Sequence, residues 1–254
     1  LFKIRKITIF KDIQNISTNE TDLNVTVTFK TSKDSENVVE GSYLFVSGTR
    51  EPNLESLGIS RIGLVQSDEG FISVNEKMQS NINSIYAIGD ITEGPLLALK
   101  AIKQGKVAVE SIAGLKPEVD LTFITRVAHT IPSVVTVELT EQMAKETSLN
   151  VRISQFSLGG NGYASITGKK DGFIKVISDA ETEIINGIHM IGEGAVEMSG
   201  SFVQLLEMAA KEEDIKFPLY AHPGFSEGLL EAVEGLIGQA IHSAPVKKKD
   251  LQTV

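Results

Sequence analysis

A short apolar segment that ends in Gly-Asp and runs into a helix constrains the fold of this chain more than any other feature. Residues 85–88 (IYAI) have the composition of a short buried strand, and Gly89-Asp90 follows at once. Pro95 suits the first turn of the next helix, and Gly114 suits its C-terminal stop. The pattern predicts a helix that packs closely on a sheet or a ligand. Its small-residue stripe at helical spacing comprises Ala98, Ala101, Ile102, Gly105, Ala108, Val109 and Ile112.

Before this segment the sequence is typical of strands. Residues 3–10 alternate basic and apolar side chains, and residues 23–29 alternate strictly. Period-two alternation predicts half-buried strands, which we expect to pair through the polar loop 14–22. Residues 43–46 (YLFV) form an unbroken apolar run, which predicts a strand covered on both faces. The apolar side of the second strand carries Leu23, Val25, Val27 and Phe29.

Beyond Pro117 the predicted strands gather together and are followed by helices. This order is typical of an α+β domain, and we place a domain boundary near Pro117. The predicted strands cover 123–137, 151–157, 173–177 and 184–191, with a turn at Asp179–Glu183. The predicted helices cover 141–146, begun by Thr140, then 197–211 and 226–241.

Composition and charge exclude several classes of function. The chain has 254 residues, a formal net charge of −9 and a pI near 5.1, which argue against nucleic acid as the main partner. The basic run Lys247–Lys249 is expected to be a solvated tail. No stretch approaches the roughly 18 consecutive apolar residues of a membrane span, and residues 1–10 lack the apolar region of a signal peptide. We therefore expect a cytoplasmic protein without a membrane partner.

The chain contains no cysteine. It therefore holds no structural disulfide, no thiolate metal site and no cysteine nucleophile of its own. Its first residue is Leu1 rather than Met, so we expect a processed or truncated chain.

Residues 221–227 (AHPGFSE) place an imidazole and a carboxylate on one short turn. Imidazole has an unperturbed pKa near 6.5, which suits proton exchange at neutral pH. A carboxylate beside it orients the ring and stabilises its charged form. Pro223 stiffens the backbone next to His222, and Gly224 allows a sharp turn before the last helix. The pattern therefore makes His222 and Glu227 candidate site residues.

Several segments resemble the flavin-dependent pyridine nucleotide–disulfide oxidoreductase family. Residues 85–90, with GPLLA at 94–98 and GKVA at 105–108, are similar to its second flavin-binding motif. The sequence from His222 to Glu227 resembles its His-Pro-x-x-x-Glu signature, and TEQMA at 140–144 resembles a helix start in its interface domain.

The resemblance covers nearly the whole chain. Residues 43–53 (YLFVSGTREPN) resemble the family's strand and Arg-x-Pro-Asn turn, although Thr49 stands where members usually have Gly. Within the family, the sequence is closest to the dihydrolipoamide dehydrogenases, with mercuric and glutathione-type reductases as the alternatives.

The resemblance implies a set of cofactors, partners and site residues. FAD and NAD would be the cofactors, with Asp90, Leu97 and Ala98 at the flavin. The protein would be a homodimer in which His222 of one subunit acts as base at the disulfide of the other, while Glu227 holds its tautomer. The substrate would be carried by the lipoyl domain of a 2-oxoacid dehydrogenase complex.

The same resemblance implies a division into three parts. Residues 1–47 would be closing strands of an NAD-binding domain and residues 48–117 part of an FAD-binding domain, together an α/β remnant. Residues 118–254 would be an α+β interface (dimerisation) domain, with the helices at 197–211 and 226–241 at the homodimer contact. An apolar stripe on the last helix, which packing within the subunit would explain equally well, comprises Leu230, Val233, Leu236, Ile237 and Ala240.

Several parts of the family's machinery do not occur in this sequence. It contains no Gly-x-Gly-x-x-Gly loop and no Cys-x-x-x-x-Cys pair. The nearest pattern, Gly160-Asn161-Gly162, has Ser165 in place of the third glycine, and we expect a turn there. Two explanations stay open: a fragment of an enzyme about twice as long, which we favour, or a stand-alone dimerisation module. The remaining histidines are expected to be structural and are His129, His189 and His242.

Overall fold

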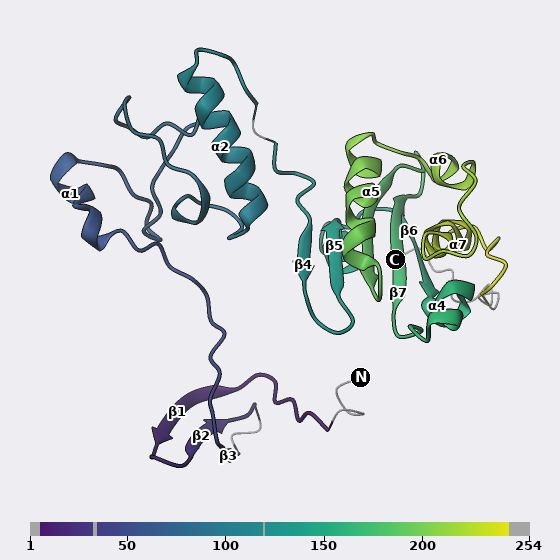
Figure 1. Cartoon of the computed structure of the whole chain (residues 1–254), viewed down its shortest axis with the longest axis horizontal. Coiled ribbons are helices and arrows are strands. Elements are labelled where there is room, and N and C mark those ends of the chain that lie inside the picture. The colour runs from purple at the N-terminus through teal and green to yellow at the C-terminus, as the bar shows by residue number, and fades with distance from the viewer. Residues whose placement is uncertain (1–5, 33–34, 119, 244–254) are drawn as a thin grey trace. The chain divides into compact units, whose positions relative to one another are not determined.

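The computed structural model describes residues 6–32, 35–118 and 120–243. The chain divides into two compact units, Leu1–Glu51 and Pro52–Val254 (Figure 1). The basic run Lys247–Lys249 lies outside the described residues. Among the described residues, none of the helices has the length and apolar character to cross a membrane.

The first unit is a three-stranded antiparallel sheet in the order β1-β2-β3. The strands are β1 (Gln14–Glu20), β2 (Val25–Lys30) and β3 (Glu36–Gly41). The hydroxyl of Thr21 accepts the N–H of Asn24 at 3.1 Å, which closes the turn between β1 and β2. The N–H of Thr21 also donates to the carbonyl oxygen of Asn24 at 2.9 Å, so side-chain and backbone hydrogen bonds together fix the turn before β2.

The position of the first strand differs from its prediction. Of the predicted strand 3–10, residues 6–10 belong to no strand and residues 3–5 lie outside the described residues. The strand β1 instead occupies most of the predicted polar loop 14–22. All of its side chains are exposed, so it carries no alternation between buried and exposed positions that a sequence could reveal. The strand predicted at 23–29 is confirmed as β2, which buries Phe29.

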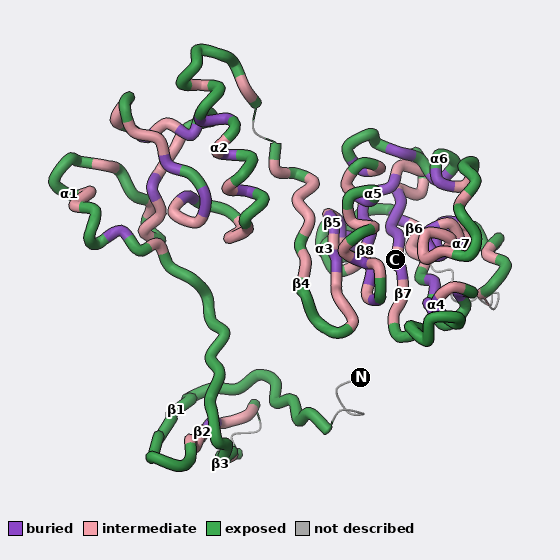
Figure 2. Tube along the Cα trace, in the orientation of Figure 1, coloured by how far each residue is buried: buried purple, intermediate pink, exposed green. Residues whose placement is uncertain are grey.

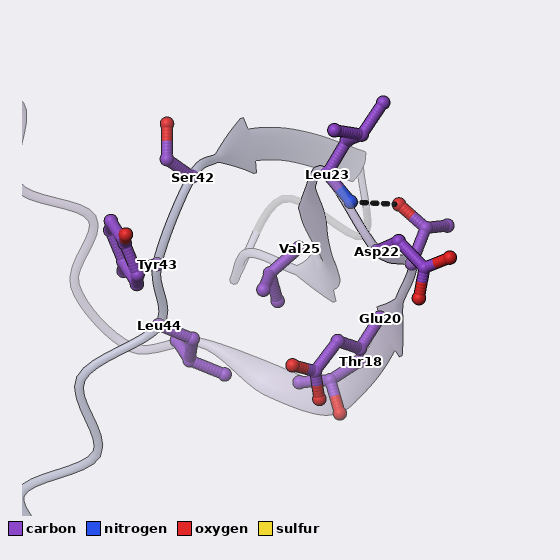
Figure 3. A pocket seen from close by; sticks show the side chains of 9 residues that line it. Thr18, Glu20, Asp22, Leu23, Val25, Ser42, Tyr43 and Leu44 are labelled. Carbon is purple, nitrogen blue, oxygen red and sulfur yellow. Dashed lines mark hydrogen bonds between the residues drawn. The ribbon is translucent and has the colours of Figure 1, made fainter.

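The prediction for residues 43–46 is wrong. The segment belongs to no strand, and the side chains of Tyr43 and Phe45 are 94% and 89% exposed. An apolar run shows that a segment favours burial, but it does not show that other residues of this chain bury it. Tyr43 and Leu44 instead border an open pocket of about 440 Å³ with Leu23 and Val25 (Figure 3). None of the predicted site residues lines this pocket.

In the second unit, residues 52–118 form turns and short helices around one longer helix. These elements are the 3₁₀ helix η1 (Glu55–Leu57), α1 (Ile59–Ile62), the 3₁₀ helix η2 (Gly89–Ile91) and α2 (Ala98–Ile112). The segment 85–88, predicted as a strand, makes one isolated bridge between Tyr86 and Gln79. Ala87 is buried and Tyr86 packs against the cluster of Met78, Val107 and Ala108, so the apolar character of the segment reflects core contacts rather than a paired strand.

Helix α2 has the predicted length but buries a different face. Its buried residues are Lys100, Gln104, Val107 and Ala108. The predicted stripe is largely in solvent, since Ile102, Val109 and Ile112 are all more than 60% exposed. The pattern of apolar residues misidentified the buried face because two of the four buried side chains are polar.

The rest of the second unit is a five-stranded antiparallel sheet with helices packed on it (Figure 1). The sheet has the order β4-β5-β8-β7-β6. Its strands are β4 (Arg126–Ala128), β5 (Val134–Glu138), β6 (Val151–Ser157), β7 (Phe173–Asp179) and β8 (Ile185–Ile191). The helical elements are α3 (Glu141–Glu146), η3 (Leu158–Gly160), α4 (Gly162–Thr167), α5 (Ala195–Glu207), α6 (Glu212–Lys216) and α7 (Glu227–Gly235).

Helices cover the two faces of this sheet unequally. Helix α5 packs on β5 and β8, and α7 packs on β6 and β7, around a core that includes Phe156, Ile174 and Phe202 (Figure 2). The smaller cluster on the opposite face joins Ala144 of α3 to Ile177 of β7. Because side chains alternate along a strand, these two clusters lie on opposite faces of β7. The face under α5 and α7 holds the main core.

Most predictions for this part are confirmed, and the α+β fold is among them. The strands predicted at 151–157, 173–177 and 184–191 are β6, β7 and β8. Thr140 caps α3 as predicted, because its hydroxyl accepts the N–H of Met143 at 3.1 Å.

Four elements differ from their predictions. The strand predicted at 123–137 is the hairpin β4–β5, with a cis Ile131-Pro132 peptide between the strands. The helix predicted at 197–211 ends early, near Ala209 with its φ of 48°, and the last helix stops at Gly235. The turn predicted at 160–162 is instead the junction between η3 and α4. The buried apolar residues of the last helix also differ from the predicted stripe. They are Leu229, Ala232 and Val233 of α7 and Leu236 just after it.

Candidate functional site

The predicted histidine and carboxylate meet at the start of α7. Nδ1 of His222 lies 2.8 Å from Oε1 of Glu227. The second carboxylate oxygen, Oε2, accepts the backbone N–H of Gly224 at 2.9 Å. His222 and Pro223 are joined by a cis peptide bond. One carboxylate therefore binds both the imidazole and the backbone of the turn that carries it.

A second contact fixes the same turn from another element. The side-chain amide of Asn161 donates to the carbonyl oxygen of Gly224 at 2.9 Å, and its Oδ1 accepts the N–H of Ala164 at the start of α4. Asn161 is 4% exposed, so these hydrogen bonds are shielded from water. The rings of Tyr163 and Phe225 pack edge to face beside it, with centroids 5.0 Å apart. The backbone of Gly224 is therefore bound on both sides, its N–H by Glu227 and its carbonyl oxygen by Asn161.

The charge on Glu227 decides which imidazole nitrogen is free. The hydrogen bond from His222 lowers the pKa of the Glu227 carboxyl, and the Gly224 N–H adds to this effect against the opposing effect of burial. An ionised carboxylate only accepts hydrogen bonds, so Nδ1 of His222 carries the hydrogen that it donates. In the neutral ring, Nε2 then holds the lone pair. The side chain of His222 is 79% exposed, so that nitrogen is open to another molecule.

His242, predicted to be structural, also has a carboxylate partner. Its Nδ1 lies 2.6 Å from Oε1 of Glu231, and its backbone N–H donates to Oε2 at 3.0 Å. Glu231 stands one helical turn after Glu227 and is buried, so α7 holds two imidazole–carboxylate pairs. A glutamate on the apolar face of a helix needs a hydrogen-bond partner when it is buried. The position of Glu231 among apolar residues of the helix was therefore the sequence signal for this contact.

The other two histidines have different outcomes. Both ring nitrogens of His189 have partners: Nε2 lies 2.8 Å from the carbonyl oxygen of Leu139, and Nδ1 contacts the hydroxyl of Thr136. Burial lowers the pKa of His189, which favours the neutral ring. Its predicted structural role is confirmed. The same role for the exposed His129 stays a prediction.

Of the residues predicted for flavin, Asp90 lies in η2, and Leu97 and Ala98 lie at the start of α2; the two elements contact each other. Asp90 is half-buried in the η2 turn, after Gly89 with its φ of 74°. A Cβ on Gly89 would lie 3.1 Å from the Cβ of Ala101, so the turn needs glycine for its conformation and for the close approach of α2.

The start of α2 offers backbone donors. Leu97 is the N-cap residue and makes no capping hydrogen bond with its side chain, and Ala98 is exposed. The first N–H groups of a helix have no partner within it and carry partial positive charge. Together with the carboxylate of Asp90, this helix start fits the hydroxyl and polar ring groups of part of a flavin.

Comparison with known proteins assigns the part that contains Asp90 and the part that contains His222 to one family. Residues 6–105 match the family described as pyridine nucleotide-disulphide oxidoreductase, and residues 124–233 match its dimerisation domain. The dihydrolipoyl dehydrogenase of Bacillus subtilis is 37% identical over 218 residues, which are 86% of this chain and 46% of that protein. That of Thermus scotoductus is 39% identical over 207 residues, 82% of this chain and 44% of that protein. The chain therefore spans about half the length of these relatives.

Two solved structures share the fold. LpdA from Mycobacterium tuberculosis has a TM-score of 0.81 at 23% identity, over 92% of this chain and 50% of that one. The HOCl-induced flavoprotein disulfide reductase RclA from Escherichia coli has a TM-score of 0.75 at 17% identity, over 87% of this chain and 50% of that one. The two family matches, taken with these relatives, show that the chain belongs to the pyridine nucleotide–disulfide oxidoreductase family.

Proposed function

We propose that this chain supplies about half of a dihydrolipoyl dehydrogenase. The proposed reaction oxidises a dihydrolipoyl dithiol to the cyclic disulfide and reduces NAD⁺ to NADH, with release of one proton. The observation that carries the proposal is the His222–Glu227 pair, in which the carboxylate contacts Nδ1 of the ring and the imidazole side chain is 79% exposed. The names of its relatives agree with it. Because these 254 residues hold no cysteine, the redox disulfide would lie in polypeptide outside them.

In this reaction His222 would move a proton of the dithiol. A thiol must lose its proton to become a nucleophile towards a disulfide, and Nε2 of the neutral ring can accept it. The ring becomes a cation, and the ionised Glu227 at 2.8 Å stabilises that charge. The same hydrogen bond keeps the lone pair on Nε2, so the ring stays in the productive tautomer.

Flavin would bind at the other predicted residues. Asp90 would accept a hydrogen bond from a ribityl hydroxyl, and the backbone at Leu97 and Ala98 would face the polar edge of the flavin ring. FAD, when bound, would carry the electron pair between the disulfide and NAD⁺. We further propose a lipoyl domain of a 2-oxoacid dehydrogenase complex as the substrate carrier and the cytoplasm as the location.

A homodimer would place His222 at its site of action. The side chain is largely exposed in this chain, although a general base works best where water is excluded. Large apolar side chains stand exposed just before it in the sequence, Phe217 at 86% and Leu219 at 100%. Exposed apolar groups beside a functional side chain favour a protein contact that covers both. The match of residues 124–233 to a dimerisation domain supports the same proposal.

The dimer is tested by making this apolar surface polar. Phe217→Ser together with Leu219→Ser should raise the dimer dissociation constant by about 100-fold or more, because each large apolar side chain that is buried contributes about 1.5–3 kcal/mol. Sedimentation velocity of the native polypeptide that carries this sequence would measure the change. Met143→Ser is the matched control, since Met143 is exposed on α3, on the opposite sheet face from α7. A double variant that dimerises like the control would remove this surface from the dimer.

The reaction itself is tested by a comparison of substrates. The native polypeptide that carries this sequence should reduce NAD⁺ with dihydrolipoamide, measured as NADH absorbance. It should show far less activity with NADPH and either glutathione disulfide or mercuric ion. Preference for one of these two substrates would assign the protein to another branch of the family. Absence of all three activities in protein with bound flavin would contradict the proposed function and favour a non-catalytic dimerisation module.

A further inference from the structure

The buried face of α2 is polar where it meets the η2 turn. Lys100 is fully buried, and Gln104 and Thr92 are 4% and 1% exposed. Lys100 and Gln104 stand one helical turn apart on the same side of α2. Burying such groups costs free energy unless each finds hydrogen-bond partners. Their partners here are the backbone groups on either side of Asp90.

The hydrogen bonds hold both ends of the turn. The ammonium group of Lys100 donates to the carbonyl oxygens of Thr92 at 2.9 Å and Glu93 at 3.0 Å. The side-chain oxygen of Gln104 accepts the N–H of Gly89 at 2.7 Å. The hydroxyl of Thr92 lies 2.8 Å from the carbonyl oxygen of Gly89 and 3.2 Å from the Gln104 side-chain oxygen. Asp90 thus lies between two backbone positions that α2 fixes.

The charge of Lys100 also acts on this turn. Burial lowers the pKa of Lys100, whereas attraction to the Asp90 carboxylate opposes that effect. The ammonium group therefore attracts the carboxylate that the proposed flavin site needs in its ionised form. A methionine at this position would keep the apolar stem but lose both the donors and the charge.

We propose that Lys100 and Gln104 are positioning residues for flavin: they hold the Gly89–Glu93 turn so that Asp90 is presented in its binding conformation. The inference rests on the proposed function, because it assumes that Asp90 contacts FAD. The two side chains touch the turn and not the flavin, so they act through preorganisation of the backbone. Loss of either one should weaken flavin binding without removing a flavin contact.

Flavin titration of the apo form of the native polypeptide tests this role. Lys100→Met should raise the FAD dissociation constant by about 10- to 100-fold, because two charge-assisted hydrogen bonds to the turn are lost. Lys103→Met is the matched control on the same helix, since Lys103 is exposed, and it should bind FAD like the wild type. Equal FAD affinity in Lys100→Met and Lys103→Met would overturn the proposal.

A second pair of variants decides the matter if Lys100→Met does not fold. Gln104→Met removes the acceptor of the Gly89 N–H, whereas Gln104→Glu keeps it. Gln104→Met should weaken FAD binding and speed hydrogen exchange of the Gly89 amide at least about tenfold in the apo protein, and Gln104→Glu should restore both. Unchanged exchange in Gln104→Met would overturn the proposal. Wild-type protein that binds no FAD would remove the proposed function first, and this role with it.

Discussion

Replacing His222 with Gln is expected to lower the rate of NAD⁺ reduction by dihydrolipoamide about 100-fold or more in the native polypeptide that carries this chain. Gln keeps a polar side chain of similar length, but it has no basic nitrogen to accept a proton from a thiol. Steady-state kinetics of NADH formation would measure the loss.

Two further variants separate the chemistry from the fold. Glu227→Gln should retain intermediate activity, because an amide can contact Nδ1 but neither fixes the tautomer nor stabilises the charged ring. His129→Gln is the matched control, since it removes an exposed imidazole on the β4–β5 loop. An unchanged rate in His222→Gln would exclude His222 from the reaction.

Replacing Arg152 with Met is expected to destabilise the second unit by about 3–5 kcal/mol. The guanidinium of Arg152 lies 3.1 Å from Oε1 of Glu212, a side chain with no exposed surface, and also donates to the carbonyl oxygen of Ala180 at 2.8 Å. Without Arg152, the buried carboxylate would keep the hydroxyl of Ser178 at 2.8 Å and the distant ammonium of Lys216 at 3.9 Å. The free energy of unfolding would be measured by urea denaturation.

An exposed ion pair provides the matched control for that variant. Lys145→Met also replaces a cation with methionine, but Lys145 and its partner Glu141 are 50% and 37% exposed, with 3.0 Å between the charged atoms. Exposed pairs contribute about 0–1 kcal/mol, so this variant should unfold at nearly the wild-type urea concentration. A loss of stability of the same size in both variants would contradict a special role for the buried carboxylate Glu212.

The α+β part of the fold was predictable because its elements carry local signals. Thr140 sits where a helix N-cap is expected, and α3 begins at the next residue. The strands β6, β7 and β8 are rich in β-branched residues and are separated by recognisable turns, such as Asp179–Glu183. In these segments the local preference and the tertiary packing agree.

The errors fall where burial depends on the rest of the structure. Residues 43–46 are apolar but exposed, and β1 is a strand with no buried face. The buried side of α2 could not be found from apolar periodicity, because Lys100 and Gln104 form part of it. Their burial depends on backbone groups of the η2 turn, which no pattern within the helix can show.

The candidate site was predictable only where its residues are neighbours in sequence. His222 and Glu227 lie on one turn, and the hydrogen bond expected between them is present. The pair of His242 and Glu231 forms only because the chain folds back on α7, so it could not be found from spacing. The roles of His222, Glu227, Asp90, Leu97 and Ala98 stay predictions until the variants are measured.

The two hydrogen bonds of Asn161 couple the first turn of α4 to the backbone that orients the His222 ring. The same amide that starts α4 also holds the backbone next to His222. If α4 frays at its first turn, Asn161 loses its support, and the turn before α7 gains freedom to tilt. Substitutions in α4 that never approach a substrate should therefore broaden the range of imidazole orientations, and turnover would fall before the protein loses measurable stability.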